Sequence, residues 1–147
     1  MKGGYSVENK KMTIALFSGS IDKLTATGVV LSGAVADDMD VEIYVLLQGA
    51  RAFMKEIAGK PEKLGMSENA DLREQFLAGL KKLNVKPWLE FFKEAKELGN
   101  VKVYVCGLAG KVWGGEKPED FIGMVDDIVG IGECITSMQE ADVHLFI

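Results

Sequence analysis

The chain has 147 residues, which is enough for one domain with a buried core and too short for two ordinary domains. Hydrophobic residues make up 48% of it and charged residues 27%, a balance typical of globular rather than disordered chains. The formal net charge of −5 argues against nucleic acid as a partner, and no apolar run approaches the roughly 20 residues that a membrane span requires.

Residues 1–10 are polar and are interpreted as a flexible N-terminal tail before a single domain over residues 11–147. The tail lacks the apolar stretch of a signal peptide, so we expect a cytoplasmic protein. The two cysteines, Cys106 and Cys134, are far apart in the sequence, which implies no disulfide framework. Two cysteines and one histidine are also too few for a typical zinc site, so no metal is expected.

Strand and helix patterns alternate along the chain. Short apolar runs predict strands at residues 12–17, 41–47, 101–105, 127–130 and 143–147. Helical spacing of apolar residues predicts helices within residues 24–35, 50–57, 72–83, 88–98, 118–125 and 132–140. Strands separated by helices form right-handed crossovers, so we predict an α/β fold, a three-layer α/β/α sandwich with a mainly parallel sheet of about five strands.

Cys106 directly follows the third predicted strand and precedes a run of small residues. Catalytic and ligand sites in parallel sheets lie beyond the carboxyl ends of the strands, which is where this thiol is expected. The backbone N–H groups of Gly107, Leu108 and Ala109 are candidates to stabilise a thiolate there. Lys111 is the candidate to supply positive charge.

Spacing excludes several familiar uses of a single cysteine. Six residues after Cys106 stands Val112, where phosphatase, arsenate reductase and rhodanese-like loops have arginine. Val103 replaces the threonine of true peroxiredoxins, and Ala109 replaces the second cysteine of a thioredoxin motif. A pairing of Cys106 with His144 as a base has no support from spacing, and a single histidine on a terminal strand is typically packed or exposed.

Other candidate residues have two interpretations each. Ser18 and Gly19 follow the first strand and fit either a phosphate site or a simple turn with a helix cap. Trp113 fits either a mobile lid over a ligand or a plug in the core or an interface. Cys134 is typical of a small buried hydrophobe, and its alternative role is a resolving thiol for Cys106.

The chain resembles the DsrE/DsrF-like sulfurtransferase family, in particular its stand-alone branch labelled peroxiredoxin-like. The resemblance runs over nearly the whole chain from Lys11 and implies the sandwich fold described above. The segments that carry it are residues 18–24, Gln48 with Gly49, and residues 103–108, 118–122, 126–130 and 141–147.

The resemblance implies sulfur handling. Cys106 would accept sulfane sulfur as a persulfide or thiosulfonate and pass it to a partner such as a TusA-like carrier. Residues 108–115 lack the second loop cysteine of some relatives, so a single-cysteine sulfur carrier or sulfurtransferase without a cofactor is expected. The resemblance also implies assembly into oligomers. The apolar run at residues 27–36 and the aromatic stripe at residues 88–92 favour a homo-oligomer, the alternative being that both faces are covered within one monomer.

Two alternative functions remain open at this point. One is an oligomeric small-ligand-binding protein without catalysis, whose pocket is lined by Gly49, Trp113 and the Cys106 loop. The other is a flavin or nucleotide binder, which absorbance of the purified protein would reveal.

Overall fold

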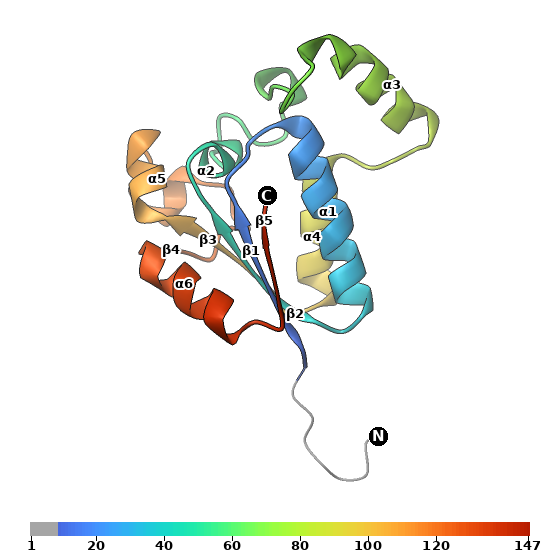
Figure 1. Ribbon diagram of the computed structural model, residues 1–147. Helices are drawn as coiled ribbons and strands as arrows, with labels where there is room; N and C mark the ends of the chain where they lie inside the picture. Colours follow the sequence, from blue (N-terminus) through green and yellow to red (C-terminus); the bar gives the residue numbers. More distant parts are fainter. Residues whose placement is uncertain (1–8) are drawn as a thin grey trace.

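The computed structural model describes residues 9–147, and most of the tail expected at residues 1–10 lies outside this range. One sheet of five parallel strands forms the centre of the molecule, in the order β4-β3-β2-β1-β5 (Figure 1). The strands are β1 (Lys11–Leu16), β2 (Asp40–Val45), β3 (Val101–Cys106), β4 (Asp127–Val129) and β5 (Val143–Phe146). The predicted α/β sandwich with a parallel sheet is confirmed.

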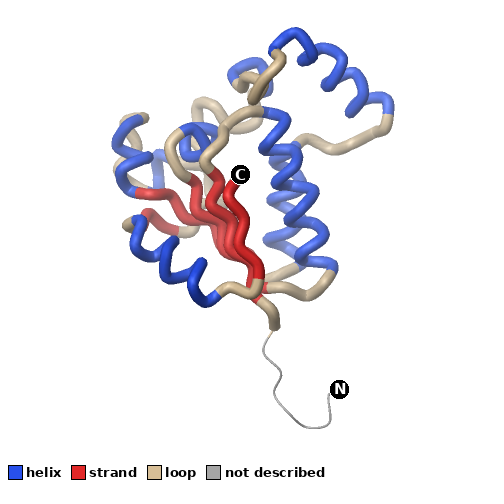
Figure 2. Tube along the Cα trace, viewed as in Figure 1, coloured by secondary structure: helices blue, strands red, loops and turns tan. Residues whose placement is uncertain are grey.

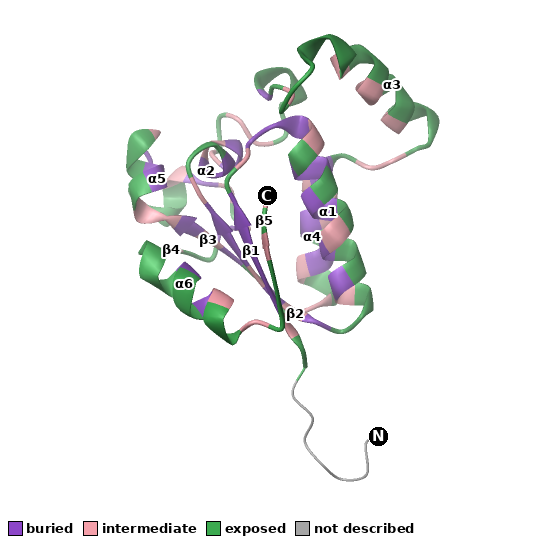
Figure 3. Cartoon of the chain, in the orientation of Figure 1, coloured by how far each residue is buried: buried purple, intermediate pink, exposed green. Residues whose placement is uncertain are grey.

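The three central strands are the most deeply buried part of the chain. Ile14, Ile43 and Val103 stand side by side across β1, β2 and β3, and all three are fully buried. β1 is a nearly continuous apolar run, as expected of a strand covered on both faces, whereas β3 alternates buried residues with more exposed ones such as Lys102. Figure 3 shows this burial concentrated on the central strands.

Helices cover the two faces of the sheet unequally (Figure 2). On one face, α1 (Ile21–Ala36) packs along α4 (Trp88–Leu98). On the other face lies α6 (Ile131–Glu140), which contacts β1. This division follows from right-handed crossovers, because the chain reverses its direction across the sheet between β4 and β5. Within residues 9–147, none of the helices combines the length and apolar character that a bilayer crossing requires.

An aromatic cluster fills the core beside α4. Phe53, Trp88 and Phe92 meet edge to face, with ring centroids 5.4–5.5 Å apart in each pair. Edge-to-face pairs add about 0.5–1.5 kcal/mol each to the stabilisation from burial. Phe53 follows α2 (Gln48–Ala52), so the same cluster anchors the connection that leads away from β2.

The segment between α2 and α4 differs from expectation. A helix, α3 (Arg73–Lys82), forms where apolar spacing predicts one, but none of its residues is buried and it lies away from the sheet (Figure 1). Leu83, part of the predicted apolar stripe, is 75% exposed. Periodicity identified the helix, and within residues 9–147 its apolar side is only partly covered, because Phe76 and Leu77 are half-buried against the core cluster.

Two local elements around β3 and β4 also differ. The turn after Cys106 is a short helix, α5 (Gly107–Val112), which the sequence did not indicate. The helix expected at residues 118–125 is only a 3-10 turn, Pro118–Asp120. Phe121 leaves that turn in extended conformation and forms an antiparallel bridge with Met54, so the following residues cannot continue a helix.

Candidate functional site

A cavity of about 410 Å³ opens at the carboxyl edge of the sheet. It collects residues that follow the ends of four neighbouring strands, β1 to β4, as expected for a site in a parallel sheet. Its lining residues are Phe17, Leu46, Leu47, Cys106, Gly107, Leu108, Ala109, Gly130 and Ile131. We call it the Cys106 cavity.

Cys106 is the only lining residue with a reactive side chain. It is the last residue of β3, has extended backbone angles (φ −68°, ψ 126°), and is half-buried. The chain then turns directly into α5, so the thiol stands where the strand meets the helix. Cys106 thus lines the cavity and also packs against the main core.

Three of the predicted site residues line the cavity together with Cys106. Gly107, Leu108 and Ala109 form the first turn of α5. The first N–H groups of a helix have no acceptor within the helix, so these amides are available to a negatively charged sulfur. Ala109 is buried and Leu108 is exposed, which places the turn at the boundary between core and solvent.

Lys111 and Trp113 do not line the cavity. Lys111 is an exposed residue of α5. Trp113 instead contacts a lining residue, because its indole Nε1 donates a 2.7 Å hydrogen bond to the Leu47 carbonyl. The Arg51 guanidinium lies 5.9 Å from the centroid of the Trp113 ring and makes a cation–π contact with it.

Leu47 is a functional candidate that the sequence did not reveal. Its backbone adopts φ 40° and ψ −112°, a left-handed conformation that is strained for a leucine. The Leu47 carbonyl is held in this conformation by the hydrogen bond from Trp113 and by a longer one, of 3.3 Å, from the Arg51 backbone N–H. Leu47 forms part of the cavity wall, so Trp113 acts on the cavity as a positioning residue.

The remaining predicted residues pack beside the cavity. A Cβ on Gly49 would lie 2.2 Å from the Leu16 carbonyl oxygen, and one on Gly19 would lie 2.2 Å from the Gln48 carbonyl oxygen. These glycines therefore allow the ends of β1 and β2 to approach closely. Ser18 makes a 2.9 Å hydroxyl contact with Ser20, which precedes α1. All three sit in the turns that support the cavity without lining it.

The other cavity-lining residues have a simple sequence signal. Phe17, Leu46, Gly130 and Ile131 follow the ends of β1, β2 and β4 within one or two residues. Once a parallel sheet is predicted, residues just beyond each strand are candidates for its carboxyl edge. The sequence analysis did not identify these residues as site residues, because apolar residues next to a strand are usually part of the core.

Cys134 and His144 lie elsewhere. Cys134 is 2% exposed within α6, and burial, with a smaller effect of nearby Cys106, raises the pKa of its thiol. His144 is exposed on β5, which β1 and β2 separate from β3, so it does not approach Cys106. Residues 9–147 contain no group of three or more His, Cys, Asp or Glu side chains that could hold a metal ion.

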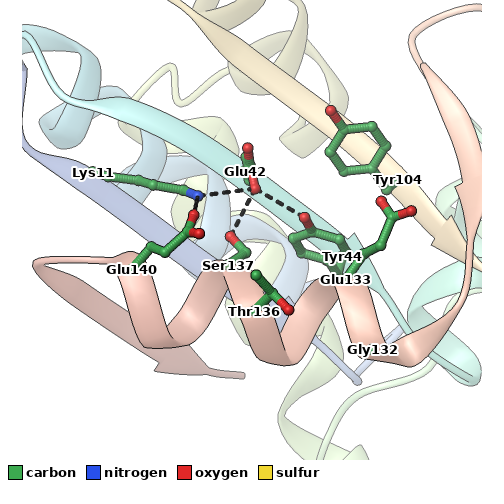
Figure 4. Close-up of a pocket in the computed structure, with 9 residues that line it drawn as sticks. All are labelled: Lys11, Glu42, Tyr44, Tyr104, Gly132, Glu133, Thr136, Ser137 and Glu140. Atoms are coloured by element: carbon green, nitrogen blue, oxygen red, sulfur yellow. Dashed lines mark hydrogen bonds and ion pairs between the residues drawn. The ribbon is translucent and has the colours of Figure 1, made fainter.

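A second cavity, of about 320 Å³, lies between α6 and the sheet and is polar (Figure 4). One oxygen of Glu42 accepts hydrogen bonds from Ser137 at 2.7 Å and Tyr44 at 2.8 Å, and lies 3.2 Å from Lys11 Nζ. Thr13, buried in β1, shares a 2.6 Å hydroxyl contact with Ser137. We call these five residues the Glu42 network.

The network sets the charge states of its members. Partial burial by itself would raise the pKa of Glu42, but the hydrogen bonds from Ser137 and Tyr44 and the nearby Lys11 outweigh it, so the pKa lies below its usual value. Burial and the contact with Glu42 raise the pKa of Tyr44. The network therefore holds a stable carboxylate that fastens α6 to β2.

Comparisons with known proteins agree with the fold. The model of the DsrE/DsrF-like family matches residues 10–146, which is nearly the whole chain. A protein of Bacillus subtilis (strain 168), "Uncharacterized protein YrkE", is 28% identical over 162 residues, covering 95% of this chain and 98% of that protein. The family suggests a protein of sulfur relay.

Proposed function

Because the chain belongs to the DsrE/DsrF-like family, we propose that it is a sulfur carrier or sulfurtransferase that acts through Cys106. Cys106 would accept sulfane sulfur as a persulfide or thiosulfonate and then release it to an acceptor. The proposal also places the protein in the cytoplasm, where reducing conditions keep thiols such as Cys106 and Cys134 free.

The observation that carries this proposal is the meeting of one accessible thiol with a cavity. Cys106 is half-buried and lines about 410 Å³ of space, enough for an added sulfur chain. The neighbouring amides of Gly107 and Leu108 are suited to stabilise a thiolate or a persulfide anion. Cys134, by contrast, is covered by α6 and the sheet.

The transfer step needs no bound cofactor. The Cys106 thiolate attacks the terminal sulfur of an inorganic polysulfide, a new S–S bond forms at Sγ, and one S–S bond of the donor breaks. The shortened polysulfide leaves with the electron pair of the broken bond. Attack of an acceptor thiolate on the outer sulfur of the Cys106 persulfide then returns the Cys106 thiolate.

Loading with inorganic polysulfide tests the proposal. The freshly reduced protein should gain the mass of one or more sulfur atoms, peptide mapping should place them on Cys106, and dithiothreitol should remove them. Iodoacetamide on a parallel sample reports whether the thiol is reachable. Alkylation of Cys106 without a sulfur adduct, from inorganic polysulfide or from a neutral organic trisulfide, would overturn the proposal.

We further propose that the protein forms a homo-oligomer and hands sulfur to a TusA-like carrier. Large apolar side chains are exposed around the Cys106 cavity and on β5, among them Leu108, Ile131 and Phe146. Contiguous exposed apolar surface commonly marks an interface between proteins. Light scattering of the purified protein measures the oligomeric state, and a single-chain mass would contradict the homo-oligomer.

The apolar cavity also favours a second candidate function, an oligomeric small-ligand-binding protein without catalysis. Ligand pockets are usually lined by hydrophobic residues with few polar groups, as this one is. In this case Cys106→Ser would keep the affinity for a ligand that co-purifies with the protein. A sulfur-transfer protein would lose its bound sulfur completely with the same substitution.

A further inference from the structure

We propose that the Cys106 cavity selects uncharged, apolar sulfane-sulfur donors, such as organic polysulfanes, over charged donors. This inference rests on the sulfur-transfer function proposed above and names the donor class that the same site takes. It follows from the composition of the cavity wall, from the placement of the nearby cations, and from the exposed rim.

Among residues 9–147, the part of the chain that the structure describes, no charged side chain lines the cavity wall. Its nine residues are glycine, alanine, leucine, isoleucine, phenylalanine and Cys106, and the reactive thiol lies among them. An anionic donor such as thiosulfate would have to shed water here without gaining a paired charge, which is costly. An apolar donor would instead bury its own surface together with that of the wall, which is favourable.

The cations nearest in the sequence to the cavity residues, Lys111 and Arg51, do not line the cavity. Lys111 is exposed on α5 and is not part of the wall. Arg51 lies over the Trp113 ring and donates a 3.1 Å hydrogen bond to the Lys63 carbonyl. Among the described residues that line the cavity, the groups able to stabilise negative charge are thus backbone amides near Cys106, which serve the thiolate itself.

The rim of the cavity is apolar as well. Leu108 is 69% exposed and Ile131 is 51% exposed, and they stand on α5 and α6 at the cavity wall. Phe17, at the end of β1, is also partly exposed and stacks on Phe146 with ring centroids 6.1 Å apart. A donor with hydrocarbon groups would cover these side chains while its sulfur atoms reach Cys106.

An organic trisulfide, R–S–S–S–R, illustrates the chemistry. The Cys106 thiolate attacks the central sulfur, one S–S bond of the donor breaks, and a bond forms between Sγ and the central sulfur. The leaving group R–S⁻ carries away the electron pair and takes a proton from water. The protein retains a trisulfide, Cys106 Sγ–S–S–R, in which the former central sulfur of the donor lies between Sγ and the terminal S–R group. The reaction consumes no external oxidant or reductant.

Three synthetic trisulfides of similar size test the inference: dipropyl, bis(2-carboxyethyl) and bis(2-aminoethyl) trisulfide. They share the reacting sulfur atoms and differ in charge, being neutral, anionic and cationic. Initial rates of adduct formation on Cys106 are measured by peptide mass spectrometry, and the same rates on urea-unfolded protein correct for intrinsic reactivity. We expect the folded protein to favour the neutral donor over both charged donors by at least about tenfold after this correction.

Lysine substitutions at the rim provide the matched variants. Leu108→Lys and Ile131→Lys change exposed side chains and place a cation at the cavity wall. Each should raise the rate of adduct formation with the anionic trisulfide several-fold and so reduce the preference for the neutral trisulfide over it. Leu98→Lys, at a 77% exposed position outside this cavity, adds the same charge and should change neither rate.

The outcomes separate the inference from the function on which it rests. Equal corrected rates for the three donors, or a faster charged donor, would overturn the apolar preference while leaving sulfur transfer intact. Failure of every trisulfide and of inorganic polysulfide to modify a Cys106 that iodoacetamide alkylates would overturn the function itself.

Discussion

The two cysteines occupy opposite environments in one small domain. Cys106 ends a central strand and opens onto an apolar cavity, whereas Cys134 is enclosed between α6 and the sheet, packed with Ala15 and Tyr44. Val129 connects the two environments, because it pairs with Cys106 in the sheet and packs against the cluster of Cys134. The two thiols thus differ in burial, since Cys106 is half-buried at a cavity and Cys134 is a core residue, and we expect their reactivity to differ accordingly.

The largest expected effect comes from exchanging the two thiols for hydroxyls. Cys106→Ser should abolish polysulfide loading, with a fall of about 100-fold or more, because serine is not ionised and is a poor nucleophile here. Cys134→Ser should load within about twofold of the unsubstituted rate, since its side chain does not line the cavity. Adduct mass measures both. Loss of loading in Cys134→Ser, with the fold retained by circular dichroism, would make Cys134 a partner in the reaction.

The next largest effect is a difference between the alkylation rates of Cys106 and Cys134 in the native protein. Iodoacetamide should label Cys134 on the order of 100-fold more slowly than Cys106, because Cys134 is buried and its raised pKa leaves less thiolate. In urea the two rates should converge. Peptide mass spectrometry at successive times provides both rates in one sample, and comparable native rates would show that α6 opens readily.

The Glu42 network should control how firmly α6 covers Cys134, and its effect depends on pH. The folded pKa of Glu42 is lowered, so its contribution to stability is fully present above its ordinary value of 4.5 and is lost as the pH falls through the folded pKa. Glu42→Gln should reduce the free energy of unfolding at neutral pH by about 1–2 kcal/mol. The substitution should also make the free energy of unfolding decrease less steeply as the pH falls below about 4.5.

Urea unfolding at a series of pH values measures this effect. Glu140→Gln is a matched control, because Glu140 lies in the same cavity but is more exposed and approaches Lys11 only to 3.6 Å. The control should shift stability by less than about 0.5 kcal/mol. If the free energy of unfolding fell in the same way at acid pH in Glu42→Gln and in the unsubstituted protein, Glu42 would not be the source of the pH dependence.

The smallest expected effect concerns the hydrogen bond between Trp113 and Leu47. Trp113→Phe keeps an aromatic ring but removes the indole donor. The Leu47 carbonyl then keeps only the longer 3.3 Å hydrogen bond from the Arg51 backbone N–H, and stability should fall by about 1 kcal/mol. Loading of Cys106 should slow by a few-fold because the cavity wall relaxes. Leu47→Gly, which suits the positive φ, should recover part of the stability lost in Trp113→Phe. Unchanged loading would show that the wall is held by other contacts.

The sheet and the place of Cys106 could be predicted because both depend on local information. β1 appears as an apolar run and β3 as a short segment rich in valine, and the alternation of such segments with helices implies parallel order. The end of β3 then places Cys106 at the carboxyl edge without knowledge of any side-chain contact.

The parts that could not be predicted depend on distant partners. The conformation of Leu47 is held by an indole 66 residues later in the chain. Phe121 leaves a predicted helix because it pairs with Met54. For α3, the apolar stripe indicates which side of the helix is apolar but not how fully the rest of the chain covers it.

The contact between Trp113 and Leu47 also gives the protein a built-in optical reporter. The chain has two tryptophans, and Trp88 is buried in the aromatic cluster beside α4, away from the cavity wall. In a Trp88→Phe protein the fluorescence would come from Trp113 alone, whose indole is bonded to the backbone of a wall residue. Any occupant that displaces Leu47 would then change the emission, so filling of the Cys106 cavity could be followed in real time without an added dye.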